Sequence, residues 1–133
     1  VVRQILKNGQ KLPESIAHQL TNLDGIEALS EVRKLDLSDT RLSDISALQK
    51  VGRLEEIILA RTEIEDIECL INMPELKVVD ISETRVIQIE SLKGLPNLEQ
   101  VILTGSECAV RALESGKYKE ISNIFERSIQ ILW

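Results

Sequence analysis

Hydrophobic and polar positions recur through the middle of the chain with a period of 22 residues. Three consecutive stretches, 32–53, 54–75 and 76–97, align without a gap, and a fourth runs from residue 98 to 106 before the pattern departs. Equivalent positions, 22 residues apart, form columns of similar side chains. The first three aliphatic columns are Val32, Leu54, Leu76 and Leu98; Leu35, Ile57, Val79 and Val101; and Leu37, Leu59, Ile81 and Leu103. A hydroxyl column follows, made of Thr40, Thr62, Thr84 and Ser106. Self-similarity at this period indicates a repeat architecture.

The spacing within one repeat predicts its local structure. Leu35 and Leu37 stand two residues apart, as in a short strand with one buried face. After Thr40, aliphatic residues recur at every third position, which suits an extended or 3₁₀-like return path with one edge inward. Because one such coil cannot bury its own apolar edge, we expect the coils to stack, with their strands side by side in a parallel sheet. The crossovers between parallel strands should be right-handed.

The two ends of the chain predict caps within a single domain that spans 1–133. Residues 20–31 read as a partial repeat, and 1–19 as an N-terminal cap of short helices. Residues 107–133 read as a C-terminal cap. Within it, 117–127 has the apolar spacing of an amphipathic helix that would lie on the last coil, rather than on a membrane surface. The alternation of Ile129, Ile131 and Trp133 predicts a final strand beside the strand of Leu103.

The segment LDLSDTRLSDISAL at 35–48, with its equivalents at 57–70 and 79–92, resembles the leucine-rich repeat family. It is most similar to the 22-residue class found in bacterial internalin-like proteins and in the regulatory subunit of protein phosphatase 1. The resemblance implies an α/β fold: a right-handed solenoid with a parallel sheet on its concave face, an irregular or 3₁₀ convex side and helical caps at both ends. It also implies recognition or regulation, and favours a bacterial source. The usual turn Asn of the family is Thr here, so a continuous Asn ladder is not expected.

Composition and net charge argue against some classes of binding partner and some settings. A net charge of −6 argues against a nucleic-acid groove, and no apolar run is long enough to span a membrane. Two cysteines are too few for a disulfide framework, so we expect a reducing, cytoplasmic setting, although an excised leader would leave no trace. The chain lacks a starting Met and is compatible with a segment of a longer protein. The single Phe, Tyr and Trp lie outside the repeats, as a narrow aliphatic coil interior would require.

Charged side chains alternate in sign down three exposed columns. These columns are Arg33, Glu55, Lys77 and Glu99; Arg41, Glu63, Arg85 and Glu107; and Asp39, Arg61 and Glu83. Stacked at strand spacing, opposite charges contribute about 0.2–1 kcal/mol per pair and disfavour a shifted register. A role in recognition is the alternative.

The sequence predicts no catalytic, cofactor or metal site. His18, the only histidine, lies in the predicted cap, so no Ser-His-Asp arrangement can form on the repeats. Cys69 occupies a small-residue column and Cys108 lies about two coils away, so neither a reactive thiol nor a disulfide is expected. No glycine-rich phosphate loop is present.

Two groups of carboxylates resemble parts of known sites, a glycosidase pair and a calcium site, but we interpret neither as such a site. Asp36 and Asp80 stand about 9–10 Å apart by strand spacing, yet no cleft or aromatic platform accompanies them as in a glycosidase. The acids of the return path are interpreted as turn or helix-start caps rather than as calcium ligands. They are Asp44, Glu65, Asp66 and Glu68.

The outward strand residues are the predicted binding surface. The expected outward set runs along each strand and one turn position beyond it, including Ser38 and Ala60. The predicted partner-binding residues are Lys34, Asp36, Glu56, Ile58, Val78, Asp80, Gln100 and Ile102. An aliphatic centre with a charged rim is typical of a protein interface, although the usual Tyr and Trp anchors are missing. The hypothesis is a non-catalytic module that binds another protein, not a nucleic acid, a membrane or a small molecule. The alternatives are a scaffold segment of a larger protein and a regulatory subunit of an enzyme.

Overall fold

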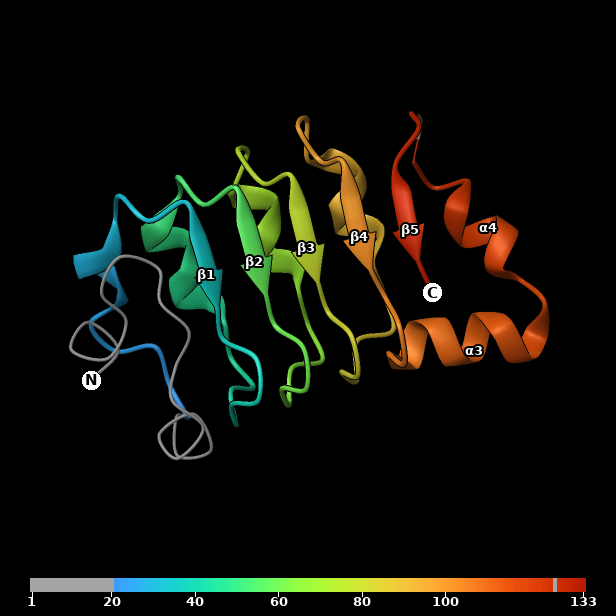
Figure 1. Ribbon diagram of the computed structural model, residues 1–133, viewed down its shortest axis with the longest axis horizontal. Coiled ribbons are helices and arrows are strands. Elements are labelled where there is room, and N and C mark those ends of the chain that lie inside the picture. Colours follow the sequence, from blue (N-terminus) through green and yellow to red (C-terminus); the bar gives the residue numbers. More distant parts are fainter. Residues whose placement is uncertain (1–20, 126) are drawn as a thin grey trace.

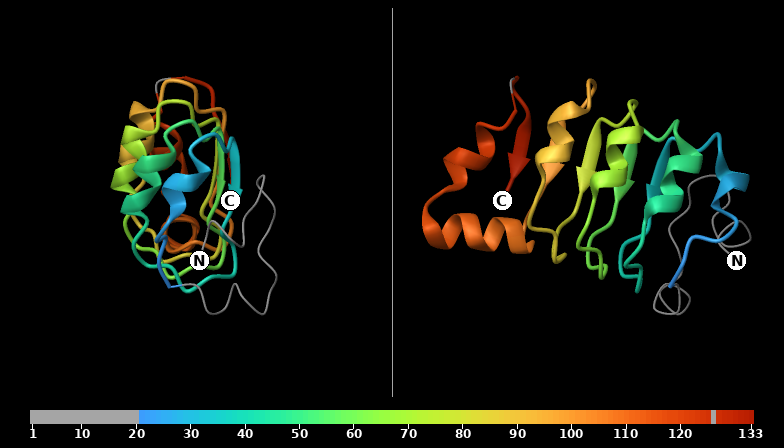
Figure 2. Two further views of the ribbon diagram at one scale, coloured as in Figure 1. Left: turned by 90° about the vertical axis from the view of Figure 1, so that its left-hand side faces the viewer. Right: turned by 180° about the vertical axis from the view of Figure 1, so that it is seen from behind.

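The computed structural model describes residues 21–125 and 127–133. Five short strands form one all-parallel sheet in chain order. The strands are Lys34–Asp36 (β1), Glu56–Ile58 (β2), Val78–Asp80 (β3), Gln100–Ile102 (β4) and Gln130–Leu132 (β5). The 3₁₀ helices are Ile26–Leu29 (η1), Ser46–Val51 (η2), Glu68–Asn72 (η3) and Glu90–Gly94 (η4). Strands and 3₁₀ helices make two layers of a flattened solenoid (Figures 1 and 2).

The sheet register confirms the stacking predicted from the repeat. Leu35 pairs with Ile57, Ile57 with Val79, and Val79 with Val101, so equivalent positions of successive coils lie side by side. The predicted final strand is also present, because Ile131 of β5 pairs with Val101. This last step differs from the others, since Gln100 and its partner Gln130 are 30 residues apart. The extra chain builds the C-terminal cap.

A thin aliphatic core fills the space between the two layers. The inward strand residues Leu35, Ile57, Val79 and Val101 are all 0% exposed, as are the return-path leucines Leu48, Leu70 and Leu92. Burial of one such side chain stabilises the fold by about 1.5–3 kcal/mol. Phe125 is the one aromatic side chain that the described part of the chain buries in this core, and it belongs to the cap. The coils themselves are therefore held by aliphatic packing.

Two aspartates of the return path act as turn caps. Asp44 Oδ1 accepts a hydrogen bond from the Ser46 amide at 2.9 Å, at the start of η2. Asp66 Oδ1 accepts one from the Glu68 amide at 2.8 Å, at the start of η3. Each carboxylate thus satisfies a backbone N–H that the first turn of a helix leaves without a partner. The interpretation of these acids as caps is confirmed for both positions.

The threonine column closes each coil on itself. Thr40 and Thr62 donate to the carbonyls of Leu37 and Leu59, both at 2.8 Å, and Thr84 donates to Ile81 O at 2.7 Å. All three hydroxyls are buried, and each partner is the carbonyl three residues earlier in the same coil. These hydroxyl bonds therefore do not link one coil to the next as an Asn ladder would. Strand pairing and core packing hold the coils together.

One position of every coil adopts a left-handed backbone conformation. Asp39, Arg61 and Glu83 have φ values of 62°, 56° and 53°, and Gly105 occupies the equivalent place with φ 69°. The left-handed conformation costs a residue with a Cβ about 1–2 kcal/mol, whereas glycine adopts it freely. The turn that ends each strand is thus strained in three coils and relaxed in the fourth.

The C-terminal cap contains two helices where one was expected. Helix α3 spans Glu107–Ser115 and helix α4 spans Tyr118–Ser122, so the helix predicted over 117–127 is shorter than expected and is preceded by an unpredicted one. Ser106 starts α3 by accepting the Ala109 amide at 3.1 Å, and Gly116 ends it with φ 73°. The buried face of α3 is made of the small residues Cys108, Ala109 and Ala112, whereas the larger Val110 and Leu113 are exposed. The predicted N-terminal cap, 1–19, lies outside the described residues.

Candidate protein-binding surface

The predicted binding residues stand in two rows across the outer face of the sheet. Strand pairing aligns Lys34, Glu56, Val78 and Gln100 in one row and Asp36, Ile58, Asp80 and Ile102 in the other. Strand β5 extends the rows with Gln130 and Leu132, respectively. We call these ten residues the sheet face. Because each strand presents alternate side chains to opposite faces, the sheet face is separated from the aliphatic core by one layer of backbone.

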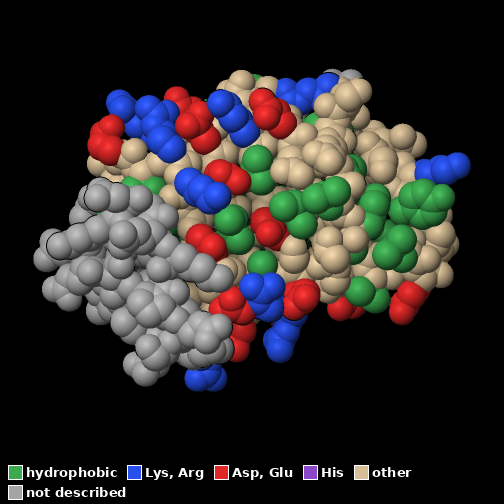
Figure 3. Space-filling model, in the orientation of Figure 1, with side chains coloured by type: hydrophobic (Ala, Val, Ile, Leu, Met, Phe, Trp, Pro, Cys, Tyr) green, Lys and Arg blue, Asp and Glu red, His purple; other side chains and the backbone are tan. Residues whose placement is uncertain are grey.

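Aliphatic side chains form the centre of the sheet face. Ile58, Val78 and Ile102 are each partly exposed, and Leu132 is 38% exposed. Figure 3 shows hydrophobic side chains mainly over the half of this face that contains β4 and β5, with charged side chains gathered toward β1. Sequence reasoning missed Leu132. The alternation of Ile129, Ile131 and Trp133 was the available signal, since inward odd positions place Leu132 outward.

The polar residues of the sheet face are held by short-range contacts. The carboxylate of Asp36 accepts hydrogen bonds from the Ser38 amide at 3.0 Å and the Ser38 hydroxyl at 2.6 Å. Asp80 accepts from the amide and hydroxyl of Ser82 in the same way. Two contacts join neighbouring strands: Lys34 Nζ lies 3.6 Å from Glu56 Oε2, and the Gln100 amide donates to Gln130 Oε1 at 3.2 Å. These polar side chains are thus held by contacts within the protein itself.

Two residues expected to point outward are buried instead. Ser38 and Ala60 are each 4% exposed, so the outward set ends at Asp36 and Ile58 in those coils. Backbone hydrogen bonds between coils continue beyond the three-residue strands, because Leu37 N donates to Ile58 O and Asp39 N donates to Ala60 O. The Ser38 hydroxyl donates to the Asp36 carboxylate, so these two side chains lie on the same side of the chain. Alternation therefore gives the side to which Ser38 points, but not how far it is covered.

The alternating charge columns pair only in part as predicted. Arg61 donates hydrogen bonds to both carboxylate oxygens of Asp39, at 2.5 and 3.0 Å. Lys77 Nζ lies 2.8 Å from Glu55 Oε1. Hydrogen bonding to Lys77 is the main cause that lowers the pKa of Glu55. Hydrogen bonding to Asp39 is the main cause that raises the pKa of Arg61.

Two other basic residues of these columns find partners elsewhere. Arg33 lies 3.5 Å from Glu75 and Arg85 lies 3.8 Å from Glu65, so each pairs outside its own column. Glu107 pairs with Arg111, four residues later on α3, at 2.9 Å. Long side chains at exposed positions reach diagonal neighbours as easily as the one directly beside them, and such pairs are worth little individually.

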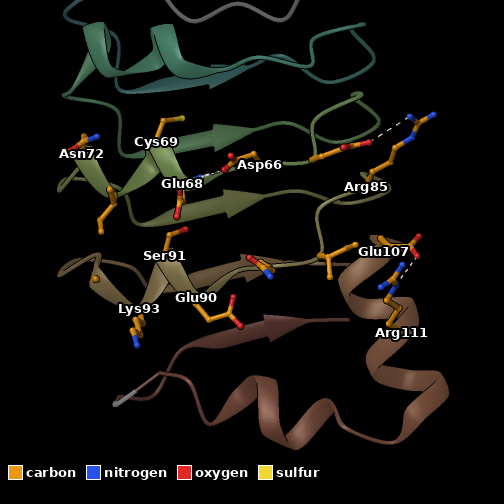
Figure 4. A pocket seen from close by; sticks show the side chains of 15 residues that line it. Asp66, Glu68, Cys69, Asn72, Arg85, Glu90, Ser91, Lys93, Glu107 and Arg111 are labelled. Carbon is orange, nitrogen blue, oxygen red and sulfur yellow. Dashed lines mark hydrogen bonds and ion pairs between the residues drawn. The ribbon is translucent and has the colours of Figure 1, made fainter.

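The opposite side of the molecule carries a groove that sequence reasoning did not predict. It has a volume of about 1210 Å³ and lies over η3, η4 and the start of α3 (Figure 4). Ile71 and Ile87 line it and are 53% and 44% exposed. The available signal was their place in the repeat. Ile71 stands where the neighbouring coils have Gln49 and Lys93, and Ile87 where they have Ser43 and Glu65.

The thiols, as placed by the structure, are poor candidates for chemistry. Cys69 and Cys108 are free cysteines. Burial, followed by the nearby carboxylates of Asp66 and Asp44, raises the pKa of the Cys69 thiol to about 11. Burial, followed by the carboxylate of Glu90, raises the pKa of Cys108. Because the thiolate is the nucleophilic form, both groups are almost entirely unreactive thiols at neutral pH.

Two other kinds of candidate site are a metal centre and a membrane-spanning helix. Within 21–125 and 127–133, no group of three or more His, Cys, Asp or Glu side chains is arranged to hold a metal ion. His18 lies outside those ranges. None of the helices described is long and apolar enough to cross a bilayer.

Comparison with known proteins identifies the fold. No protein-family model and no curated protein sequence matches this chain. Solved structures do, and those compared are leucine-rich repeat proteins. A leucine-rich repeat protein of Leptospira interrogans matches 92% of the chain with a TM-score of 0.70 and 12% identity. The Drosophila melanogaster SNF/U2A' complex matches 86% with a TM-score of 0.69 and 17% identity. An internalin of Listeria monocytogenes matches 65% with a TM-score of 0.62 and 18% identity.

The protein therefore has the leucine-rich repeat fold, as the sequence pattern predicted. The chain spans about a quarter of the internalin, 34% of the Leptospira protein and 67% of the matched chain of the Drosophila complex. The last of these was solved as part of a complex. At these identities the likeness concerns the arrangement of the coils, and does not extend to the residues of the sheet face.

Proposed function

We propose that the protein is a non-catalytic module that binds another protein on its sheet face. The observation that carries this proposal is the aliphatic centre formed by Ile58, Val78, Ile102 and Leu132 on a rigid sheet. No helix or strand within the described ranges covers it (Figures 1 and 3). Burying partly exposed aliphatic side chains releases about 25 cal/mol per Å² of apolar surface. A partner that covers this strip thereby gains free energy that an all-polar surface would not supply.

The rim of the sheet face favours a partner with complementary charge. Asp36 and Asp80 flank Ile58 in the same row, and each side chain is already fixed by hydrogen bonds to the serine two residues later. A partner that places cationic groups opposite these carboxylates would not have to order them on binding. Charge complementarity of this kind sets specificity and association rate more than affinity. The sheet face thus combines aliphatic side chains with two preorganised carboxylates, of which Asp80 stands between Ile58 and Ile102.

The experiment is site-specific photocrosslinking followed by substitution. A photoreactive amino acid is placed at Ile102 on the sheet face or at Leu113, which is 56% exposed on α3. Proteins crosslinked in cells are identified by mass spectrometry, and the specific partner is then made in pure form. We expect a crosslink from position 102 and not from position 113.

Binding of that purified partner is then compared between two kinds of variant. Ile58→Lys combined with Ile102→Lys should weaken it at least tenfold. Leu113→Lys, the matched control, should leave it within about twofold. Equal binding by a folded double variant would refute the sheet face as the interface.

A further inference from the structure

The groove on the side away from the sheet differs from the surrounding solenoid surface because aliphatic side chains are exposed in it. Its floor and walls come from equivalent positions of two successive coils, in η3 and η4, and α3 closes one end (Figure 4). In a regular solenoid a further return path would stack against η4. Here the chain enters α3 after Ser106 and builds the cap instead. The groove therefore lies over the return paths of two successive coils, and the start of α3 bounds it at one end.

Apolar surface is exposed inside this groove without a covering side chain. Ile71 and Ile87 are among the most exposed large aliphatic residues that the structure describes. Gly94 stands beside Ile71, and a Cβ at Gly94 would lie 3.6 Å from Ile71 Cδ1. Because glycine offers no side chain there, the flank of Ile71 stays uncovered. Neighbouring coils have polar side chains at the equivalents of both isoleucines, so the apolar exposure is local to this groove.

The groove is lined by more acidic than basic side chains, so its net charge is negative. Two of its acids are paired with its two arginines, Glu65 with Arg85 at 3.8 Å and Glu107 with Arg111 at 2.9 Å. The lining acids that remain are Asp66, Glu68 and Glu90. The one remaining lining cation is Lys93. Among the described residues, no cation lies within ion-pair distance of Glu68 or Glu90. The carboxylates of Asp66 and Glu90 also help to raise the pKa of the nearby thiols, as a negative local potential requires.

We propose that this groove is a second docking site, which binds a peptide segment of a partner protein that carries Lys or Arg side chains interleaved with aliphatic ones. Ile71 and Ile87 supply the apolar contacts, and Glu68 and Glu90 receive the cationic groups. Charge complementarity selects this occupant, because an acidic or purely apolar segment would leave the carboxylates unpaired against it. The site is independent of the sheet face, from which the core separates it (Figure 2).

The first part of the test uses two synthetic probes of twelve residues. One alternates Leu and Lys, and the other alternates Leu and Glu. Each is labelled with a zwitterionic dye and titrated with the protein while fluorescence anisotropy is recorded. We expect the Leu–Lys peptide to bind and the Leu–Glu peptide not to bind. Chemical shifts of the ¹⁵N-labelled protein should change at Glu68, Ile71, Ile87 and Glu90. Changes confined to the sheet face would overturn the proposal.

The second part separates the groove from the overall charge. Glu68→Lys combined with Glu90→Lys should weaken binding of the Leu–Lys peptide at least tenfold. Glu114→Lys combined with Glu120→Lys makes the same change in net charge at exposed positions of α3 and α4, and should weaken it less than threefold. Circular dichroism verifies that both variants fold. Equal losses in the two variants would show attraction to net charge alone, and would overturn the proposal. Ile58→Lys combined with Ile102→Lys should leave peptide binding unchanged, so failure of this site and failure of the sheet face are distinguishable.

Discussion

Energetic coupling between core residues should fall off with the number of strands that separate them. Ile57, Val79 and Val101 occupy one column of the core and are all 0% exposed. Val79 lies on the strand next to Ile57, whereas Val101 lies on the strand after that. Strands are about 4.8 Å apart, so the first pair is in contact and the second is separated by about 9–10 Å. The two pairs offer the same chemistry at different distances.

The substitutions are Ile57→Val, Val79→Ala and Val101→Ala, alone and in pairs. Ile57→Val should cost about 0.5–1.5 kcal/mol. Each Val→Ala removes two buried methyl groups, so it should cost about 2–3 kcal/mol with the cavity included. Neighbouring substitutions share one cavity and relax together, so the Ile57–Val79 cycle should give a coupling energy of about 0.5 kcal/mol or more. The Ile57–Val101 cycle should be additive within about 0.3–0.5 kcal/mol.

Urea unfolding followed by far-ultraviolet circular dichroism measures each free energy of unfolding. An unchanged dependence on urea concentration verifies that the variants expose the same surface on unfolding. A coupling energy between Ile57 and Val101 as large as that between Ile57 and Val79 would refute the reasoning. The molecule would then behave as one globular core rather than as stacked coils with nearest-neighbour contacts.

Two further predictions concern the turn and the thiol. Glu83→Gly relieves a left-handed backbone conformation that costs about 1–2 kcal/mol. Glycine also makes the unfolded chain more flexible, which lowers stability by about 0.5–1 kcal/mol, so thermal unfolding should show unchanged or raised stability. Glu63→Gly, in the preceding coil two residues after the left-handed Arg61 and itself not at positive φ, should lower the stability, and equal losses in both variants would contradict the strain. Cys69, with its pKa raised from 9.0 to about 11, should react with iodoacetamide at pH 8 about 100-fold more slowly in the folded protein than in urea. Its contribution to stability is complete below pH 9 and is lost as the pH rises through 11, so Cys69→Ser should flatten the alkaline fall in melting temperature. Equal alkylation rates in the two states would contradict the raised pKa.

The sequence predicted the sheet well because its signal is repeated. Leu35, Ile57 and Val79 each mark the inward face of a strand, and three aligned copies indicate both the strand and its neighbour. The cap carried a weaker signal. Helix α3 buries only small residues, so its hydrophobic face was not recognised, although Ser106 and Gly116 stand at its two ends as capping residues. Ion pairs were also predicted only in part, because Arg33 and Arg85 reach diagonal partners that a column alignment cannot distinguish from direct ones.

By itself, the order of residues determined the coil, its stacking, the aliphatic filling and the two rows of the sheet face. These properties follow from local periodicity, and from the requirement that one coil's apolar edge be covered by the next. Only the tertiary structure decided how far each strand extends, that Ser38 and Ala60 are covered, and how α3 interrupts the stack. It alone revealed that Ile71, Ile87 and unpaired carboxylates line one groove. Exposure and pairing depend on which side chains from distant segments occupy the same space, and no periodicity along the chain records that.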